Sequence, residues 1–362
     1  MLIIANKLSM LTTYAPIVTG APATRDAWLS AWLAAAVAFL IALVPFLLMR
    51  RFPGQTLFAI NVQVLGTWAG RVMNLAYALL FFHLGSIAVR LFSEVFVVAM
   101  LPETPIWALN TLIVALAAFG VLSGFEVLGR LADLVAPMIL LTIILLTLLS
   151  GTLIQTSRLF PLLEYGPGPV VEQSLTPITI FGEMSWTLFL AMPYIKRSRD
   201  AFKGMAVAAV VNGAAVSFGA ALLIAMMGPE LIDREVFPTL TAVRLIRVAE
   251  FLTRIEWVMA ALWMGAMFVK IGLIFWGVVG ALRESGLPKL RQPFLLLIIS
   301  VATSVWSQWI FFDTLELMAT FQPANSLPLS LPVQLFLPLL TLTVALLRGQ
   351  RGTPQEPVKA HG

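Results

Sequence analysis

A single carboxylate lies inside one of the most apolar stretches of the chain. Residues 176–196 read TPITIFGEMSWTLFLAMPYIK, with Glu183 preceded by Gly182 and Pro177. An ionised side chain inside a bilayer costs on the order of 2.5 kcal/mol or more, so such residues mark functional sites by default. Proline removes a backbone donor and glycine tolerates irregular backbone, which together predict an interrupted helix that lines a ligand site. The predicted site residues here are Ile180, Phe181, Gly182 and Glu183.

Two interpretations of Glu183 follow from its position. In the first, its side chain lines the site and meets a cationic group of a ligand, such as an α-amine, or serves there as a protonated carboxylate. In the second, it is a structural carboxylate that pairs with a neighbouring helix. The first interpretation is the prediction, and the second is its alternative.

The composition indicates a membrane protein with many spans. Of the 362 residues, 60% are hydrophobic and 11% are charged, whereas soluble domains are about a quarter charged. The absence of cysteine and the presence of only two histidines exclude cysteine-ligated and histidine-rich metal sites. The net charge of +5 fits basic cytoplasmic loops. We therefore expect contact with membrane lipid, no nucleic-acid partner, no metal and no cofactor.

Apolar runs of about 20 residues predict an all-α membrane domain, residues 1–348, followed by a short disordered cytoplasmic tail, residues 349–362. The ten predicted spans are 1–18, 27–49, 72–100, 105–122, 131–153, 175–195, 204–227, 249–282, 294–312 and 329–347. Most of the 23 basic residues lie on one side when both termini are cytoplasmic. The basic residues within 230–256 do not follow this rule, because they fall on the external side. Their interleaving with acidic side chains predicts an external, charge-paired helix.

Ten spans divide into two halves of five, and an odd number per half makes the second half enter from the opposite side. This predicts a 5+5 inverted repeat whose helices one and six are both interrupted. In the first half the corresponding segment is KLSMLTTYAP, residues 7–16, where short hydroxyl side chains can bond to freed backbone groups. The predicted site residues from this segment are Ser9, Thr12 and Thr13. The alternative is an ordinary span with a proline, Pro16, near its outer end.

Two further spans carry polar side chains at helical spacing. In the span 72–100, His83, Arg90 and Glu94 share one face, which must turn to the interior of the bundle. We expect Arg90 and Glu94 to pair, and we assign His83 to the site as a proton relay, with a hydrogen-bonded core histidine as the alternative. In the span 249–282, Trp263 and Lys270 share a face, and Lys270 is expected to extend to the cytoplasmic surface.

Sequence motifs for catalysis are absent. The chain has no G-x-x-x-x-G-K-[ST] loop, no H-E-x-x-H helix and no G-x-S-x-G elbow. The protein is therefore not expected to be an enzyme, and any transport would be driven by a gradient rather than by ATP hydrolysis.

Several short motifs follow one another along nearly the whole chain. They are RDAWLSAWLAA at 25–35, RFPGQTL at 51–57, LPETPIWAL at 101–109, FPLLEYGPGPV at 160–170, FGEMSWTLFLAMPYIKR at 181–197 and the block from Val236 to Met264. Together they resemble the spore-germination permease family, the B subunits of nutrient germinant receptors, within the amino acid–polyamine–organocation superfamily. The match of FGE to the family motif carries the predicted site to Gly182 and Glu183.

The resemblance implies the ten-helix fold with broken helices one and six. It also implies a receptor that senses a small nutrient, an amino acid or a sugar, in the inner membrane of a dormant spore. The implied partners are an A subunit with a cytoplasmic domain and a lipoprotein C subunit. The alternatives are a proton- or sodium-coupled amino acid permease, which needs the same pocket, and a scaffold whose polar faces only join helices.

Overall fold

The computed structural model describes residues 1–9, 24–232, 234–246, 255–286 and 290–352, and these residues form helices and loops without a β-strand. Within these residues, seven helical spans are long and apolar enough to cross a membrane, and α6 (Ile106–Leu122) is a shorter apolar helix. The predicted class, an all-α membrane protein with several spans, is confirmed at this level.

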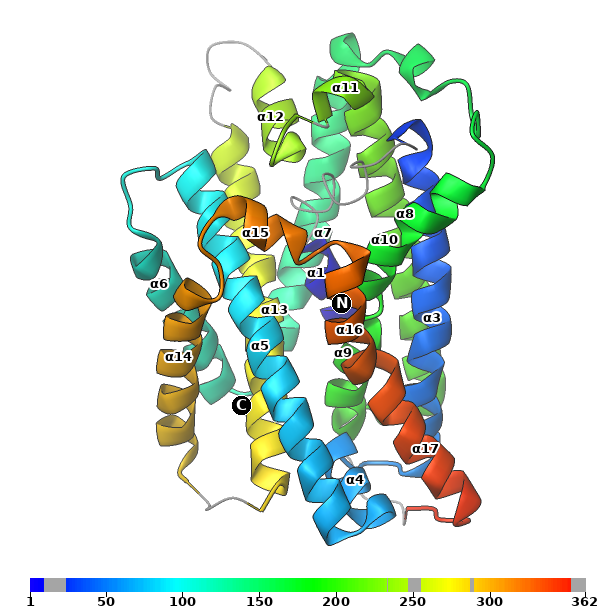
Figure 1. Ribbon diagram of the computed structural model, residues 1–362, viewed down its shortest axis with the longest axis vertical. Coiled ribbons are helices and arrows are strands. Elements are labelled where there is room, and N and C mark those ends of the chain that lie inside the picture. Colours follow the sequence, from blue (N-terminus) through cyan, green and yellow to red (C-terminus); the bar gives the residue numbers. More distant parts are fainter. Residues whose placement is uncertain (10–23, 233, 247–254, 287–289, 353–362) are drawn as a thin grey trace.

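Most of the described helices stand beside one another in an elongated bundle (Figure 1). Among them are α3 (Ala27–Arg51), α5 (Thr67–Ala99), α7 (Phe125–Leu149), α8 (Gly168–Phe181), α9 (Met184–Ala191), α10 (Ser198–Met227), α13 (Ile255–Glu284), α14 (Gln292–Trp309), α16 (Pro323–Leu331) and α17 (Leu337–Leu347). The other described helices are α1 (Leu2–Leu8), α4 (Leu57–Leu65), α11 (Pro229–Ile232), α12 (Pro238–Leu245) and α15 (Thr314–Ala319).

Each predicted span from the second onward coincides with a helix or with two consecutive helices. The sixth span corresponds to α8 followed by α9, and the tenth to α16 and α17, which a π-helical turn (Pro332–Phe336) joins. Of the first span the structure describes α1 and Ser9, because residues 10–23 lie outside the described part of the chain. The count of ten spans and the inverted repeat stay predictions.

The helix packing places α1 and α13 in the interior of the bundle. Helix α13 packs against α5, α6 and α7, and α1 packs against α7, α10 and α13. Helix α3 packs against α8, α9 and α10, while α6 and α14 lie side by side at one edge (Figure 1). Polar side chains on α1, α8 and α13 therefore have partners within reach inside the bundle.

The outer surface is apolar, as a lipid-facing surface must be. On α7, Leu134, Leu141 and Leu148 recur every seven residues and are 60%, 65% and 74% exposed. A soluble protein rarely presents a continuous apolar stripe of this kind, whereas a helix in a bilayer gains by exposing it.

The predicted charge-paired helix over residues 230–256 is wrong in its extent. The described part forms two short helices, α11 and α12, and residues 233 and 247–254 lie outside the description. Proline begins each helix, because its missing N–H and fixed φ suit the first turn and oppose continuation of an earlier helix. Before α12, Glu235 accepts a 2.7 Å hydrogen bond from Thr241 Oγ1.

The start of the predicted C-terminal tail packs against the end of α3. The N–H of Gly352 donates to the carbonyl oxygen of Arg51 at 3.0 Å, and the guanidinium of Arg51 donates to the carbonyl oxygen of Gln350. Residues 353–362 lie outside the described part, so a disordered tail stays a prediction for them.

Candidate functional site

The helical path through residues 168–191 is interrupted at the predicted place. Helix α8 ends at Phe181 and α9 begins at Met184, so Gly182 and Glu183 stand between them. Backbone bonds bridge the gap, because Gly182 N donates to Ile178 O at 2.7 Å and Glu183 N to Ile180 O at 3.3 Å. The interruption is therefore short. Backbone carbonyl oxygens beside it are available to accept hydrogen bonds from side chains of other helices.

Gly182 is required for its size rather than for its backbone freedom. Its φ of −61° and ψ of −18° are ordinary right-handed values, so the prediction that glycine serves irregular backbone here is wrong. A Cβ atom on Gly182 would lie 2.1 Å from Oε1 of Gln334 and 2.8 Å from the carbonyl oxygen of Ile178. Only a residue without a side chain allows Gln334 to approach this closely.

Gln334 closes the interruption from the opposite helix. It lies in the π-helical turn between α16 and α17 and is fully buried. Its side-chain Nε2 donates to the backbone carbonyl oxygen of Thr179 at 2.6 Å, and its backbone carbonyl oxygen accepts a hydrogen bond from Ser185 Oγ. Gln334 is not among the site residues predicted from the sequence. Its one signal in the sequence is that it is an amide inside the apolar run 329–347. In the structure it lies in a π-helical turn, and such turns often mark functional sites.

Glu183 is the centre of a buried charged cluster. Lys7 Nζ lies 2.6 Å from Oε2 of Glu183 and 2.6 Å from the carbonyl oxygen of Ile180. Lys270 Nζ lies 2.9 Å from both carboxylate oxygens of Glu183. The side chains of Lys7, Lys270 and Glu183 are only 1%, 4% and 12% exposed. Glu183 therefore joins α1 and α13 to α9, as the structural interpretation of this carboxylate requires.

Both lysines of the cluster were missed as site residues. The expectation that Lys270 extends to the cytoplasmic surface is wrong, because it stands near the middle of α13. At 1.5 Å per residue, roughly 20 Å of helix separate Lys270 from Glu284, farther than a lysine side chain extends. The available signal for Lys7 and Lys270 was the same as for Glu183, namely an ionisable residue inside an apolar run.

The other predicted residues of the first span are only partly described. Ser9 ends α1, is fully buried, and donates from Oγ to the carbonyl oxygen of Asn6 at 2.5 Å. Its own carbonyl oxygen accepts a hydrogen bond from Trp263 Nε1, so the predicted inward face of α13 does hold both Trp263 and Lys270. Thr12, Thr13 and Pro16 lie outside the described residues.

We expect the substitution Trp263→Phe to lower the free energy of unfolding by about 1–2 kcal/mol, because it leaves the buried carbonyl oxygen of Ser9 without its donor. SDS titration of the purified protein in mixed micelles would measure this change. The matched control is Trp257→Phe on the same helix, where the indole is 42% exposed. Equal effects of the two substitutions would contradict the importance of the Trp263 hydrogen bond.

A cavity opens beside the charged cluster, between α5, α8, α13 and α16, with about 500 Å³ of empty space when its open mouth is included. Glu183 and Lys270 are the charged residues among those that line it. The polar lining is completed by Thr179, Thr320, Ser326 and Ser330, and the apolar lining by Leu84, Ile87, Ala88, Leu91, Ile180, Phe321 and Leu329. Ligand sites commonly combine a mainly apolar wall with a few polar groups in this way.

Of the predicted site residues that the structure describes, Ile180 and Glu183 line this cavity, whereas Ser9, His83, Phe181 and Gly182 do not. His83 precedes Leu84 on α5 and is partly exposed, and Phe181 is buried one residue before the interruption. Ile180 contributes twice, because it lines the cavity and its carbonyl oxygen accepts the bond from Lys7.

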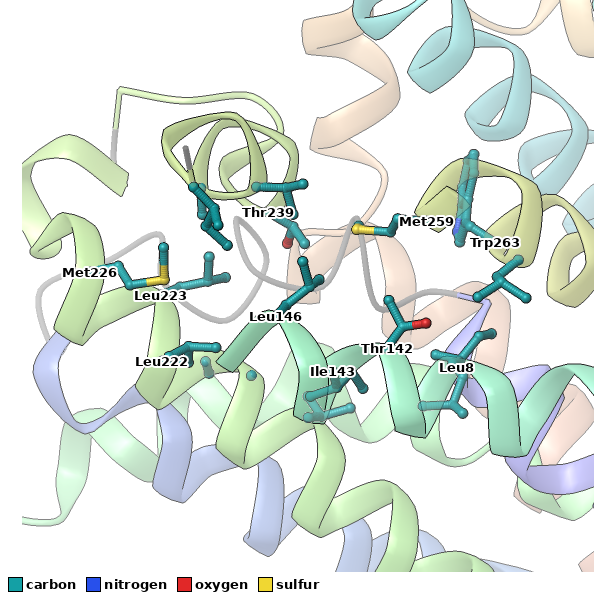
Figure 2. Close-up of a pocket in the computed structure, with 18 residues that line it drawn as sticks. Leu8, Thr142, Ile143, Leu146, Leu222, Leu223, Met226, Thr239, Met259 and Trp263 are labelled. Carbon is teal, nitrogen blue, oxygen red and sulfur yellow. The ribbon is translucent and has the colours of Figure 1, made fainter. Parts of the chain in front are cut away.

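A second and larger cavity, with about 850 Å³ of empty space when its open mouth is included, has an almost wholly apolar lining among the described residues. Figure 2 shows Leu8, Leu146, Leu223, Met226 and Met259 around it, and among the described lining residues the hydroxyls come from Thr142 and Thr239. None of the described residues that line it is charged, so these residues offer a small polar molecule little to bind.

The predicted pair of Arg90 and Glu94 is confirmed. Arg90 Nε donates to Glu94 at 3.1 Å, and Arg90 Nη1 donates to the carbonyl oxygen of Phe311 at 3.2 Å. Thr314 Oγ1 donates to the other oxygen of Glu94. The pair therefore fastens α5 to the segment that leads into α15.

Comparison with known proteins assigns the chain to a family. A family model described as "Spore germination protein" matches residues 1–313. Spore germination protein KB of Bacillus subtilis is 30% identical over 352 residues, which cover 92% of this chain and 90% of that protein. Spore germination protein YndE of the same species is 22% identical, covering 72% and 71% of the two chains, and GerQB of Bacillus cereus is 23% identical, covering 76% and 75%. The chain therefore belongs to the spore germination permease family of multi-pass membrane proteins.

Proposed function

We propose that this protein is the membrane subunit of a germinant receptor and that it binds a small nutrient in the cavity beside Glu183. The observation that carries the proposal is the coincidence of three features at one place: a helix interruption, a buried charged cluster and a cavity. Ligand binding at an interrupted helix is the arrangement of many transporter folds. The names of the relatives support a role in germination.

Several finer features belong to the same proposal. The fold is a ten-span, 5+5 inverted repeat, and both termini lie on the cytoplasmic side of the spore inner membrane. The chain is not an enzyme, and it works with receptor A and C subunits. The basic residues at the ends of α3, α13 and α17 support the orientation, since they gather at one end of the bundle (Figure 1).

Thermal stabilisation of the detergent-purified protein by amino acids, sugars and nucleosides tests the binding site. A ligand present at 100 times its dissociation constant stabilises the folded state by about 2.7 kcal/mol. We expect a specific stabilising compound in wild-type protein and none in Ala88→Leu, because the added side-chain atoms occupy the cavity beside Glu183.

The control uses the second cavity. Ala220 lines the apolar cavity, so Ala220→Leu introduces the same side chain at a comparably buried place. Retained stabilisation in Ala220→Leu together with loss in Ala88→Leu would support the proposed site. The reverse pattern would assign the binding site to the apolar cavity instead. If no compound stabilises the wild-type protein, the proposal is contradicted.

Transport would use the same cavity, so a different measurement is needed to distinguish a permease from a receptor. Uptake of the radiolabelled stabilising compound into proteoliposomes, with and without a proton or sodium gradient, would show permease activity. Gradient-driven accumulation would replace the receptor proposal with the permease, whereas binding without uptake supports a receptor whose partners respond to the ligand.

A further inference from the structure

The apolar cavity is a slot that runs along two helices. Its lining extends from Ile139 to Leu146 on α7 and from Val216 to Met226 on α10. At 1.5 Å per residue, these stretches are roughly 10 Å and roughly 15 Å long. The rest of the described lining comes mainly from α12 and α13, and no residue of the charged cluster belongs to it. The cavity is therefore separate from the proposed nutrient site, and its shape suits an extended chain.

One side of the apolar cavity opens to the lipid-facing surface. Ile143 on α7 and Leu222 on α10 line the cavity and are only half-buried. Ile144, which follows Ile143, is 55% exposed, and Phe218, one turn before Leu222, is 48% exposed. The cavity is thus continuous with the apolar stripe that α7 presents to the bilayer, so a chain from the surrounding lipid can enter it sideways.

Helix α12 places a free hydroxyl at the cavity. The side-chain oxygen of Thr239 is buried, yet it has no hydrogen-bond partner among the described residues. Figure 2 shows this side chain beside Leu146. The hydroxyl of Thr142, also in the lining, already donates to the carbonyl oxygen of Met138 at 2.9 Å. Because buried hydroxyls are rarely left without a partner, Thr239 indicates an acceptor on whatever occupies the cavity.

The end of the cavity away from Met226 is apolar and closed. Figure 2 shows Leu8 and Trp263 at this end, and they are only 1% and 3% exposed. The indole N–H of Trp263 already donates to the carbonyl oxygen of Ser9. The free hydroxyl therefore lies toward α12, at the outer end of the bundle in Figure 1, whereas the deep end offers only apolar contact.

Neither water nor empty space suits this cavity. A water molecule buried in a protein typically makes about three hydrogen bonds, and the described lining offers one free side-chain donor, Thr239. An unfilled void loses the dispersion contacts of its walls and destabilises the fold in proportion to its volume. An acyl chain that enters from the bilayer restores those contacts without losing a hydrogen bond.

We propose that the apolar cavity binds one acyl chain of a membrane phospholipid. The ester carbonyl oxygen accepts the hydroxyl of Thr239, and the chain runs between α7 and α10 toward Leu8 and Trp263. The headgroup stays outside the cavity on the side of α12. Because Leu8 follows Lys7 directly, the bound chain also packs against the helix that carries one lysine of the charged cluster. This lipid site goes beyond the proposed nutrient site and does not depend on it.

A photoreactive lipid tests the proposal on the full-length protein in vesicles. The probe is an ester-linked phosphatidylglycerol with a diazirine near the end of one acyl chain, diluted into ether-linked phosphatidylglycerol. After irradiation and digestion, mass spectrometry locates the adducts. We expect adducts on Met259 and Trp263, which line the cavity and are only 9% and 3% exposed. Adducts on the exposed Leu141 and Leu148 of α7 give the level of ordinary lipid contact.

The substitution Ala220→Leu fills the cavity and should lower the adduct yield on Met259 and Trp263 by roughly tenfold or more, with the yield on Leu141 unchanged. The matched control is Ala88→Leu, which fills the other cavity and should change neither yield. If Ala220→Leu does not fold, Thr239→Val replaces it. This variant removes only the hydroxyl, so it should lower the yield roughly fivefold with the ester-linked probe and leave it unchanged with an ether-linked probe.

Each outcome decides the lipid site without deciding the nutrient site. Adducts on Met259 and Trp263 that disappear in Ala220→Leu and persist in Ala88→Leu support the inference. Adducts confined to the exposed leucines of α7, or equal yields in wild type and Ala220→Leu, overturn it. Labelling of Met259 by a diazirine-bearing palmitic acid but not by the phospholipid assigns the cavity to a free fatty acid and also overturns it. Thermal stabilisation by nutrients is measured separately, so failure of one proposal leaves the other standing.

Discussion

Replacing Glu183 with glutamine is expected to lower the free energy of unfolding by about 3–5 kcal/mol, the largest effect of any single substitution considered for this protein. The amide leaves Lys7 and Lys270 buried near each other without the carboxylate that now bonds to both. Burying unpaired charge costs more than the lost hydrogen bonds, because the interior cannot replace the hydration of the ammonium groups. SDS titration of the purified protein measures the change.

The control for this substitution is Glu172→Gln, which makes the same chemical change on α8 at an exposed position. It should change stability by no more than about 0.5 kcal/mol.

A second variant replaces Lys7, Glu183 and Lys270 together with methionine, which removes every charge of the cluster. This triple variant should be more stable than Glu183→Gln, since apolar replacement of a buried ionic cluster is often neutral. Wild-type stability of Glu183→Gln would show that the ion pairs do not support the fold.

The substitution Gly182→Ala is expected to cost about 1–3 kcal/mol, the usual penalty for forcing atoms into a filled interior. The new methyl group would lie 2.1 Å from Oε1 of Gln334 and 2.8 Å from the carbonyl oxygen of Ile178, so either the Gln334 side chain or the α8–α9 interruption must move. Because Glu183 follows directly, the same displacement should also weaken ligand stabilisation of the purified protein.

Gly204→Ala is the matched control, because a Cβ atom there meets no atom within 4 Å. It lies inside α10, so it should be neutral or stabilising by about 0.5–1 kcal/mol. Combining Gly182→Ala with Gln334→Ala removes the clashing amide and should recover part of the loss. Equal stability of Gly182→Ala and wild type would show that Gln334 does not need the space beside Gly182.

The spans were predictable because the bilayer imposes a simple length rule. A crossing helix must satisfy its backbone groups internally and present about 20 apolar residues, so span positions follow from hydropathy alone. The helices α3, α5, α6 and α10 accordingly lie close to their predicted ranges. The interruption at Gly182 was predictable for a similar reason, since glycine beside a carboxylate is exceptional inside an apolar run.

The partners of Glu183 were decided by the tertiary structure alone. Lys7 lies 176 residues from Glu183 in sequence and Lys270 lies 87 residues away, and hydropathy contains no information about which helices meet. For the same reason, the close approach of Gln334 to Gly182 had no sequence signal of its own. The sequence by itself determined which segments are long and apolar enough to cross a membrane and which side chains are costly there. Only the packing of α1, α9 and α13 decided how that cost is offset, because ion pairing depends on distances of a few ångströms between segments remote in the chain.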